Sequence, residues 1–260
     1  MIKRKLIFVV VLLLLTGCSQ NISKDTVVPS NSNVEKDKIV QQSESDHFIF
    51  YAAEQDKACI KDLIKTLEDN YTRITDDLDA SLNKKASIYI YSDLSTFHAA
   101  INQPDAPSWV VGIALPGTTT IKIVNPSNAD GRPYSDMMKV IVHEFTHIVT
   151  MNINSDVYNI PLWLSEGIAV FEAEQSEGTA EVISRAKSSN EYPTLKSIES
   201  GTNNFGTRGG YQFSYSIIEY MVNTYGYDKV IALIKSPSEF EKILGLSEED
   251  FQKEWIAHLK

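Results

Sequence analysis

The spacing of apolar residues changes twice along the chain. Positions 6–15 are all apolar. Residues 19–45 contain no aromatic residue and are rich in Ser, Asn, Asp, Lys and Gln, and from His47 onward apolar residues recur at strand-like and helix-like intervals. A polar segment of that composition buries too little apolar surface to offset the entropy of ordering. We therefore expect a flexible tether over residues 18–45 and a single folded domain over residues 46–260.

The first part of that domain predicts a small sheet with one long helix. Runs of β-branched and aromatic residues indicate strands at Phe48–Tyr51, Ile88–Tyr91, Trp109–Leu115 and Thr118–Val124. Between the first two strands, apolar residues recur at intervals of three and four, as on one face of a helix: Ile60, Leu63, Ile64, Leu67, Tyr71, Ile74 and Leu78. From Ser135 onward, helical patterns replace strands. Strands followed by helices predict an α+β domain, with the site expected where the two halves meet.

One helical segment carries side chains that can bind a metal. The segment His143–His147 reads His-Glu-Phe-Thr-His, and Ser135 and Asp136 are candidate N-caps of its helix. Residues four apart lie one turn above each other on a helix, so both imidazoles face the same side and can share one ion. Glu144 lies beside that face, where it could accept a proton from water without being a ligand. The alternative is a coincidental pair of histidines.

The next helical segment supplies a third candidate ligand. Pro161 is suited to the first turn of a helix, and Glu166 follows within the otherwise apolar stretch Trp-Leu-Ser-Glu-Gly-Ile-Ala. A carboxylate in such surroundings needs a partner, which two imidazoles around a cation would supply. Alternatively, Glu166 is an exposed residue of an amphipathic helix.

Together, these two segments resemble the gluzincin metallopeptidases, in particular the aminopeptidase-type branch and its smaller bacterial peptidase MA-like relatives. The resemblance implies a zincin-like fold, with a small N-terminal sheet and a mainly helical half that carries the metal-binding helix. It also implies zinc as the cofactor, bound by His143, His147 and Glu166, with Glu144 as the general base and a peptide or protein as the substrate. A later helix is similar to the one in which these enzymes carry an oxyanion-stabilising tyrosine. Tyr211 occupies the matching place, and Tyr215 is the second choice.

Two departures limit the resemblance. The Gly-x-Met-Glu-Asn signature of true aminopeptidases is absent, and the nearest upstream segment, Gly112–Gly117, contains no carboxylate, so exopeptidase activity is not implied. Thermolysin-like enzymes place an acidic residue four positions after the ligand glutamate to orient a histidine, whereas this chain has Val170 there.

The sequence also predicts which segments border the substrate cleft. The segment Thr118–Val124 is the last strand candidate before the metal helix, so we expect it to form the cleft's edge, where an extended peptide could add as another strand. The glycine-containing stretch Ser200–Gly210 is either a rim of that cleft or a plain connector.

The N-terminal apolar run predicts export. Lys3-Arg4-Lys5 precedes ten apolar residues, which is the length of a signal-peptide core, whereas a membrane-spanning helix needs about 20. The run ends in Leu15-Thr16-Gly17-Cys18, which resembles the bacterial lipobox. That resemblance implies that residues 1–17 are removed and that Cys18 carries a lipid that holds the domain at the extracytoplasmic face of the cell membrane. The alternative is an ordinary secretory signal with a chance cysteine.

Composition narrows the class of protein. The chain has 260 residues, 43% of them hydrophobic, and this is enough for one sizeable core. Its net charge of −10 argues against nucleic acid as a partner. Its two cysteines, Cys18 and Cys59, form neither a disulfide framework nor a Cys-pair zinc site.

Two hypotheses remain: a membrane-anchored zinc peptidase, or a non-catalytic lipoprotein binding module stabilised by zinc. Glu144 favours the first, because a purely structural site needs no general base.

Overall fold

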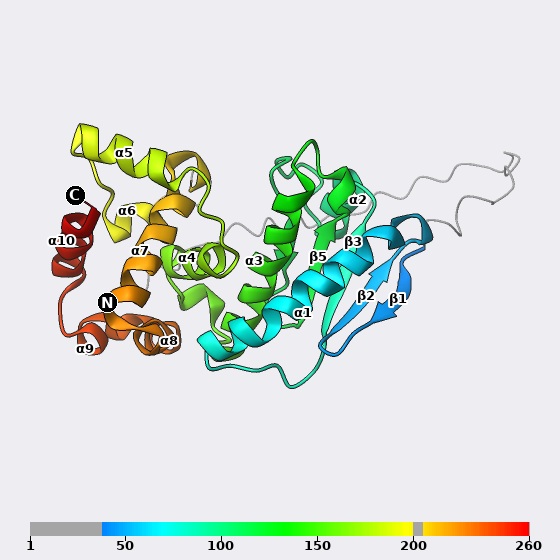
Figure 1. Ribbon diagram of the computed structural model, residues 1–260, viewed down its shortest axis with the longest axis horizontal. Helices are drawn as coiled ribbons and strands as arrows, with labels where there is room; N and C mark the ends of the chain where they lie inside the picture. The colour runs from blue at the N-terminus through cyan, green and yellow to red at the C-terminus, as the bar shows by residue number, and fades with distance from the viewer. Residues whose placement is uncertain (1–37, 200–204, 260) are drawn as a thin grey trace, which may run out of the picture. The chain divides into compact units, whose positions relative to one another are not determined.

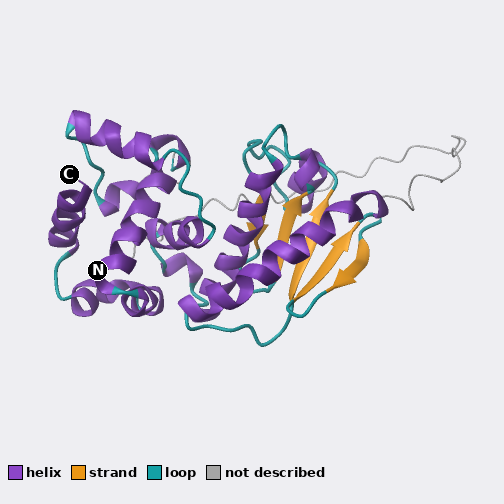
Figure 2. Cartoon of the chain, in the orientation of Figure 1, coloured by secondary structure: helices purple, strands orange, loops and turns teal. Residues whose placement is uncertain are grey.

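A computed structural model of the chain describes residues 38–199 and 205–259. Its strands all lie in the first half of the chain, and the second half is helical (Figures 1 and 2). This confirms the predicted α+β class with a small N-terminal sheet. The predicted signal segment, Cys18 and the first part of the tether lie outside the described residues. No helix in the described part is both long enough and apolar enough to cross a membrane.

Five strands form one sheet in the order β1-β2-β3-β5-β4. They are β1 (Val40–Glu44), β2 (Phe48–Ala52), β3 (Ala86–Tyr91), β4 (Gly112–Ala114) and β5 (Thr120–Val124). The three inner strands are parallel, and β1 and β4 run antiparallel at the two edges. Burial alternates along β2 and β3, as expected for side chains that point to opposite faces of a strand.

Two predictions near the sheet were wrong: the extent of the tether, and which strand forms the edge of the cleft. Residues 40–44, predicted as tether, form β1; their sequence Val-Gln-Gln-Ser-Glu lacks apolar alternation, and pairing with β2 rather than intrinsic propensity accounts for the strand. The segment Thr118–Val124, predicted as the cleft's edge, contributes β5, which lies inside the sheet. Gly112 of β4 pairs with Ile123 and Ala114 with Ile121, so the edge strand is β4.

The helix with the histidine pair, α3 (Tyr134–Ile153), packs beside α1 (Ile60–Asp77) and against the sheet (Figure 1). The ring of Phe145 on α3 lies 5.6 Å from that of Tyr71 on α1 and 5.2 Å from that of Phe48 on β2. The predicted caps of α3 were wrong, because the helix begins earlier: Pro133 occupies the N-cap position, and Ser135 falls in the first turn.

The remaining helices follow in order: α2 (Leu94–Ala100), α4 (Leu162–Glu172), α5 (Thr179–Ser189), α6 (Leu195–Glu199), α7 (Gly210–Tyr225), α8 (Tyr227–Lys235), α9 (Phe240–Leu244) and α10 (Glu248–Leu259). The close contact between α4 and α7 depends on Gly167. A Cβ atom there would lie 2.7 Å from Cγ1 of Ile218 and 3.0 Å from the backbone oxygen of Ser214, so a larger residue would push the helices apart.

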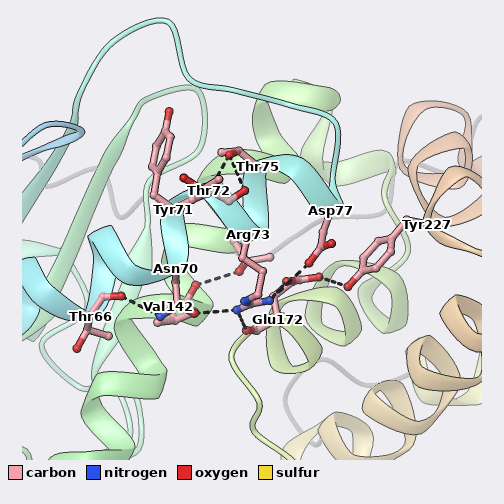
Figure 3. A network of polar contacts seen from close by, with 11 residues as sticks. Thr66, Asn70, Tyr71, Thr72, Arg73, Thr75, Asp77, Val142, Glu172 and Tyr227 are labelled. Atoms are coloured by element: carbon pink, nitrogen blue, oxygen red, sulfur yellow. Dashed lines mark hydrogen bonds and ion pairs between the residues drawn. The ribbon is translucent and has the colours of Figure 1, made fainter.

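The C-terminal end of α4 is held by a partly buried polar network (Figure 3). Arg73 of α1 donates to the Glu172 carboxylate at 2.5 Å and to the Glu172 backbone oxygen at 2.6 Å. The hydroxyl of Tyr227, at the start of α8, donates to the other carboxylate oxygen at 2.8 Å. The Glu172 side chain is fully buried, and burial raises its pKa despite these donors. The network therefore joins three helices at the end of the helix that carries Glu166.

Candidate metal centre

Three donor atoms converge between α3 and α4. Nε2 of His143 lies 3.1 Å from Nε2 of His147, and Oε2 of Glu166 lies 3.3 Å from the first and 3.8 Å from the second. Two ligand atoms of a tetrahedral zinc site, each with a bond of about 2.0–2.1 Å, lie about 3.3 Å apart. The three atoms are therefore spaced to share one ion. The structure thus brings together the three residues that the sequence predicts as ligands.

Each ligand is positioned by its helix. His143 and His147 are one turn apart on α3, and their rings lie 4.8 Å from each other at an angle of 82°. Glu166 faces them from α4, whose position is fixed by the tight contact at Gly167 and by the network around Glu172. All three side chains are largely buried.

The electrostatics of this group favour a bound cation. Burial alone would raise the pKa of Glu166, but His147 and His143 outweigh it and hold that pKa well below the ordinary range. Burial likewise disfavours the charged form of His147, but Glu166 outweighs it and raises the pKa of that imidazole. An ionised carboxylate between two imidazoles is thus the stable arrangement, and it presents a negative charge to an ion.

Glu144 lies next to this group, against the edge strand. It is 8% exposed, and the backbone of Ala114 in β4 lies close enough to its carboxylate to lower the pKa in part. The contact is close, since a Cβ atom on Gly112 would lie 3.2 Å from Oε1 of Glu144. Burial raises the pKa of Glu144, although the two histidines oppose the shift. A buried carboxylate with a raised pKa suits a residue that takes up and returns a proton near neutral pH.

Gln175 contacts one of the candidate ligands and was not predicted from the sequence. Its amide oxygen lies 3.0 Å from Nδ1 of His143, on the ring atom that does not face the other donors. The position where an acidic partner would be expected, Val170, is a buried apolar residue that lines the adjacent cavity. Nothing in the local sequence distinguishes Gln175 from its polar neighbours.

The segment that carries Gln175 is held in place from α3. Lys139 donates to the backbone oxygen of Glu174 at 2.9 Å and forms an ion pair with Glu177. Glu174 adopts a left-handed backbone with φ 52°, and the backbone N–H of Gln175 then donates to the oxygen of Val170. These contacts direct the Gln175 side chain back toward His143.

Tyr211, but not Tyr215, lines the cavity next to these residues. It is half-buried near the start of α7, and its ring meets that of Phe205 at 4.9 Å. Burial raises its pKa, and the nearby charges of Glu166 and Glu144 raise it further, so its phenol stays protonated and can donate a hydrogen bond. Tyr215 instead packs against Phe171, with ring centroids 5.6 Å apart, and does not line the cavity.

A cavity of about 580 Å³ opens beside His143 and Glu144. Its walls come from the loop that leads into β4, the first half of α3, the segment after α4 and the start of α7. Phe205 and Thr207 also line it, so the described part of the stretch Ser200–Gly210 forms part of the rim, while residues 200–204 lie outside the described part of the chain. The volume is within the range of sites that bind small ligands or short peptide segments.

Comparison with known proteins adds one finding. A family model described as the Peptidase MA superfamily matches residues 66–252, a range that includes α3, α4 and α7. No curated protein matches the chain.

Proposed function

The chain belongs to the Peptidase MA superfamily, and on that basis we propose that it is a zinc-dependent peptidase that hydrolyses peptide bonds. The observation that carries this proposal is the position of Glu144. Its carboxylate lies against β4, beside the three convergent ligand atoms, without being one of them. A site that only stabilised the fold would need the donors but not this buried acid.

The three candidate ligands suit zinc, the metal that this function requires. His143, His147 and Glu166 would hold zinc, which binds imidazole nitrogen and carboxylate oxygen and leaves a position open when only three protein ligands are present. When bound, zinc supplies Lewis acidity, which lowers the pKa of water to about 7 and polarises a carbonyl.

Glu144 would act as the general base. It would accept a proton from the attacking water and return that proton to the departing amine, and a carboxyl with a raised pKa can do both. Tyr211 would donate a hydrogen bond to the substrate carbonyl oxygen as negative charge develops there. An extended peptide would pair with the edge strand β4, which places its backbone next to Glu144.

Zinc content and turnover together test the proposal. The full-length wild-type chain and Glu144→Gln are compared for bound zinc and for cleavage of a mixed peptide library, with Glu181→Gln, an exposed residue of α5, as the control. We expect the same content of bound zinc in the wild type and both variants. Turnover should fall by about 10²–10⁴-fold in Glu144→Gln alone. Equal, metal-dependent cleavage by Glu144→Gln would exclude Glu144 as the base. Bound zinc without cleavage by any variant would favour the binding module.

We also propose that the domain is anchored through a lipid on Cys18 at the extracytoplasmic face of the cell membrane. The support is the lipobox-like sequence that ends at Cys18. Two or more acyl chains hold a protein stably at a bilayer, whereas a single chain does not. We expect Cys18→Ser to move the chain from the membrane fraction to the soluble fraction. Unchanged membrane association of that variant would contradict the anchor.

A further inference from the structure

The cavity beside Glu144 contains a cation without an ionic partner. Arg132 lines the cavity, and its Nη2 donates to the backbone oxygen of Trp109 at 3.4 Å. Across residues 38–199 and 205–259, no carboxylate lies within ion-pair distance of its guanidinium. The other cation of the cavity, Lys139, is already paired with Glu177. The positive charge of Arg132 therefore remains available to a ligand.

Besides Glu144 and Glu177, the cavity is lined by Asp136, whose carboxylate does not neutralise the positive charge of Arg132. Asp136 lies in the first turn of α3, where the free N–H groups of the helix stabilise a negative charge, and it accepts a hydrogen bond from Ser135 at 3.3 Å. Its charge is thus compensated locally.

The backbone holds Arg132 in a defined position. Gly131 has a left-handed φ of 75°, the N–H of Arg132 donates to the oxygen of Ala129 at 3.0 Å, and the next residue, Pro133, is the N-cap of α3. The guanidinium lies close enough to Tyr211 to oppose the rise in the pKa of that phenol. A group bound at Arg132 would therefore lie in the same cavity as the side chains proposed to act on the peptide bond.

Trp109 adds an apolar surface at the same place. Trp109 lines the cavity and is 60% exposed, which is unusual for so large an apolar residue, and its backbone oxygen is the acceptor for Arg132. Exposed tryptophan is a common anchor for the apolar part of a binding partner.

We propose that Arg132 and Trp109 form a subsite for a carboxylate of the substrate, either an acidic side chain or a free C-terminus. The planar guanidinium can bind both oxygens of a carboxylate, and the indole can cover the adjoining aliphatic part. This inference rests on the proposed peptidase function, because it assigns the substrate class of the same cavity.

Matched peptides test the subsite. A peptide that the wild type cleaves is prepared with a free C-terminal carboxylate or an amide, and separately with Glu or Gln at each internal position. We expect a preference of about tenfold to a hundredfold in kcat/KM for one carboxylate form over its neutral partner. The pair that shows it identifies the source of the carboxylate. In Arg132→Gln the preference should disappear through a rise in KM with little change in kcat, and Arg132→Lys should keep part of it. Arg185→Gln, which removes an exposed charge on α5 away from the cavity, is the control.

Binding without turnover separates this inference from the proposed function. The same acid and amide peptides are titrated calorimetrically into zinc-loaded Glu144→Gln, with and without Arg132→Gln, after equal zinc content and melting temperature have been verified. Binding of the acid that depends on Arg132 supports the subsite even if the wild type cleaves nothing. The subsite would be excluded if Arg132→Gln still bound the acid peptide more tightly than the amide, or if it lost the same affinity for both peptides.

Discussion

The amide oxygen of Gln175 lies 3.0 Å from Nδ1 of His143, while Nε2 of the same ring faces His147 and Glu166. An acceptor at Nδ1 fixes the ring as the tautomer whose Nε2 carries the free lone pair, which is the form that binds a metal. A neutral amide thus takes the role that a carboxylate plays in many metal sites.

Gln175→Ala is expected to weaken zinc binding. Without the acceptor, the ring of His143 loses its fixed orientation, and the loss of such a partner typically lowers metal affinity about 10–100-fold. Competition with a chromophoric chelator measures the affinity. Gln175→Glu, which keeps an acceptor, should bind zinc at least as tightly as the wild type. Gln212→Ala is the control, because Gln212 also lines the cavity but its amide donates to the backbone oxygen of Glu177. Equal affinity in Gln175→Ala and Gln212→Ala would contradict this role.

The sequence predicts the centre of this site because the signal is local. The spacing of His143 and His147 fixes their common face once the segment is helical, and an acid within an apolar helix is conspicuous at Glu166. The role of Gln175 is not local. It depends on the left-handed backbone at Glu174 and on a contact from Lys139, 35 residues earlier in the chain.

The sheet shows the same limit. The buried strands β2 and β3 are evident from their runs of aromatic and β-branched residues. In contrast, β1 forms because it pairs with β2. The edge position of β4 follows from its pairing with β5, and a strand of three residues carries too little sequence pattern to predict that pairing.

Arg73→Met is expected to destabilise the fold and to disturb α4. The fully buried carboxylate of Glu172 would lose its cationic partner. Because Arg73 is itself 38% exposed, we expect a cost of about 1–3 kcal/mol in the free energy of unfolding, as for a buried polar group left without its partner. Because burial already raises the pKa of Glu172, the penalty should grow with pH as the unpaired group is forced to ionise. Urea unfolding at pH 5 and pH 8 measures this. The double variant Arg73→Met with Glu172→Gln should recover part of the loss, and no recovery would mean that the two residues act independently.

For a second carboxylate, that of Glu68, the contribution to stability depends on pH in the opposite direction. Glu68 accepts hydrogen bonds from the backbone N–H of His47 at 2.9 Å and from Nδ1 of its ring at 2.6 Å. Burial alone would raise the pKa of Glu68, but these bonds outweigh it and lower that pKa below its ordinary value. A group with a lowered pKa in the folded chain stabilises the fold above its ordinary pKa, and this contribution is lost as pH falls through the folded value.

Glu68→Gln should therefore reduce the free energy of unfolding by about 1 kcal/mol at pH 7, and the difference from wild type should narrow below pH 4. Urea titrations at both pH values provide the measurement. Glu181→Gln, an exposed substitution of the same kind, should show no such difference. A defect in Glu68→Gln that stays constant between the two pH values would show that the ionised form is not what stabilises the fold.

Tyr211→Phe is expected to slow peptide turnover without changing zinc content. The substitution removes only the phenol hydroxyl, which burial and the charges of Glu166 and Glu144 keep protonated as a donor. Loss of one donor to a developing oxyanion lowers kcat about 10²–10³-fold, and KM should change little because the bond strengthens only in the transition state. Tyr215→Phe is the matched control: it lies on the same helix, packs against Phe171 and does not line the cavity, so it should turn over substrate at the wild-type rate. If instead both variants lose the same activity, or if Tyr211→Phe loses zinc, the hydroxyl acts through the structure of α7 and not on the substrate.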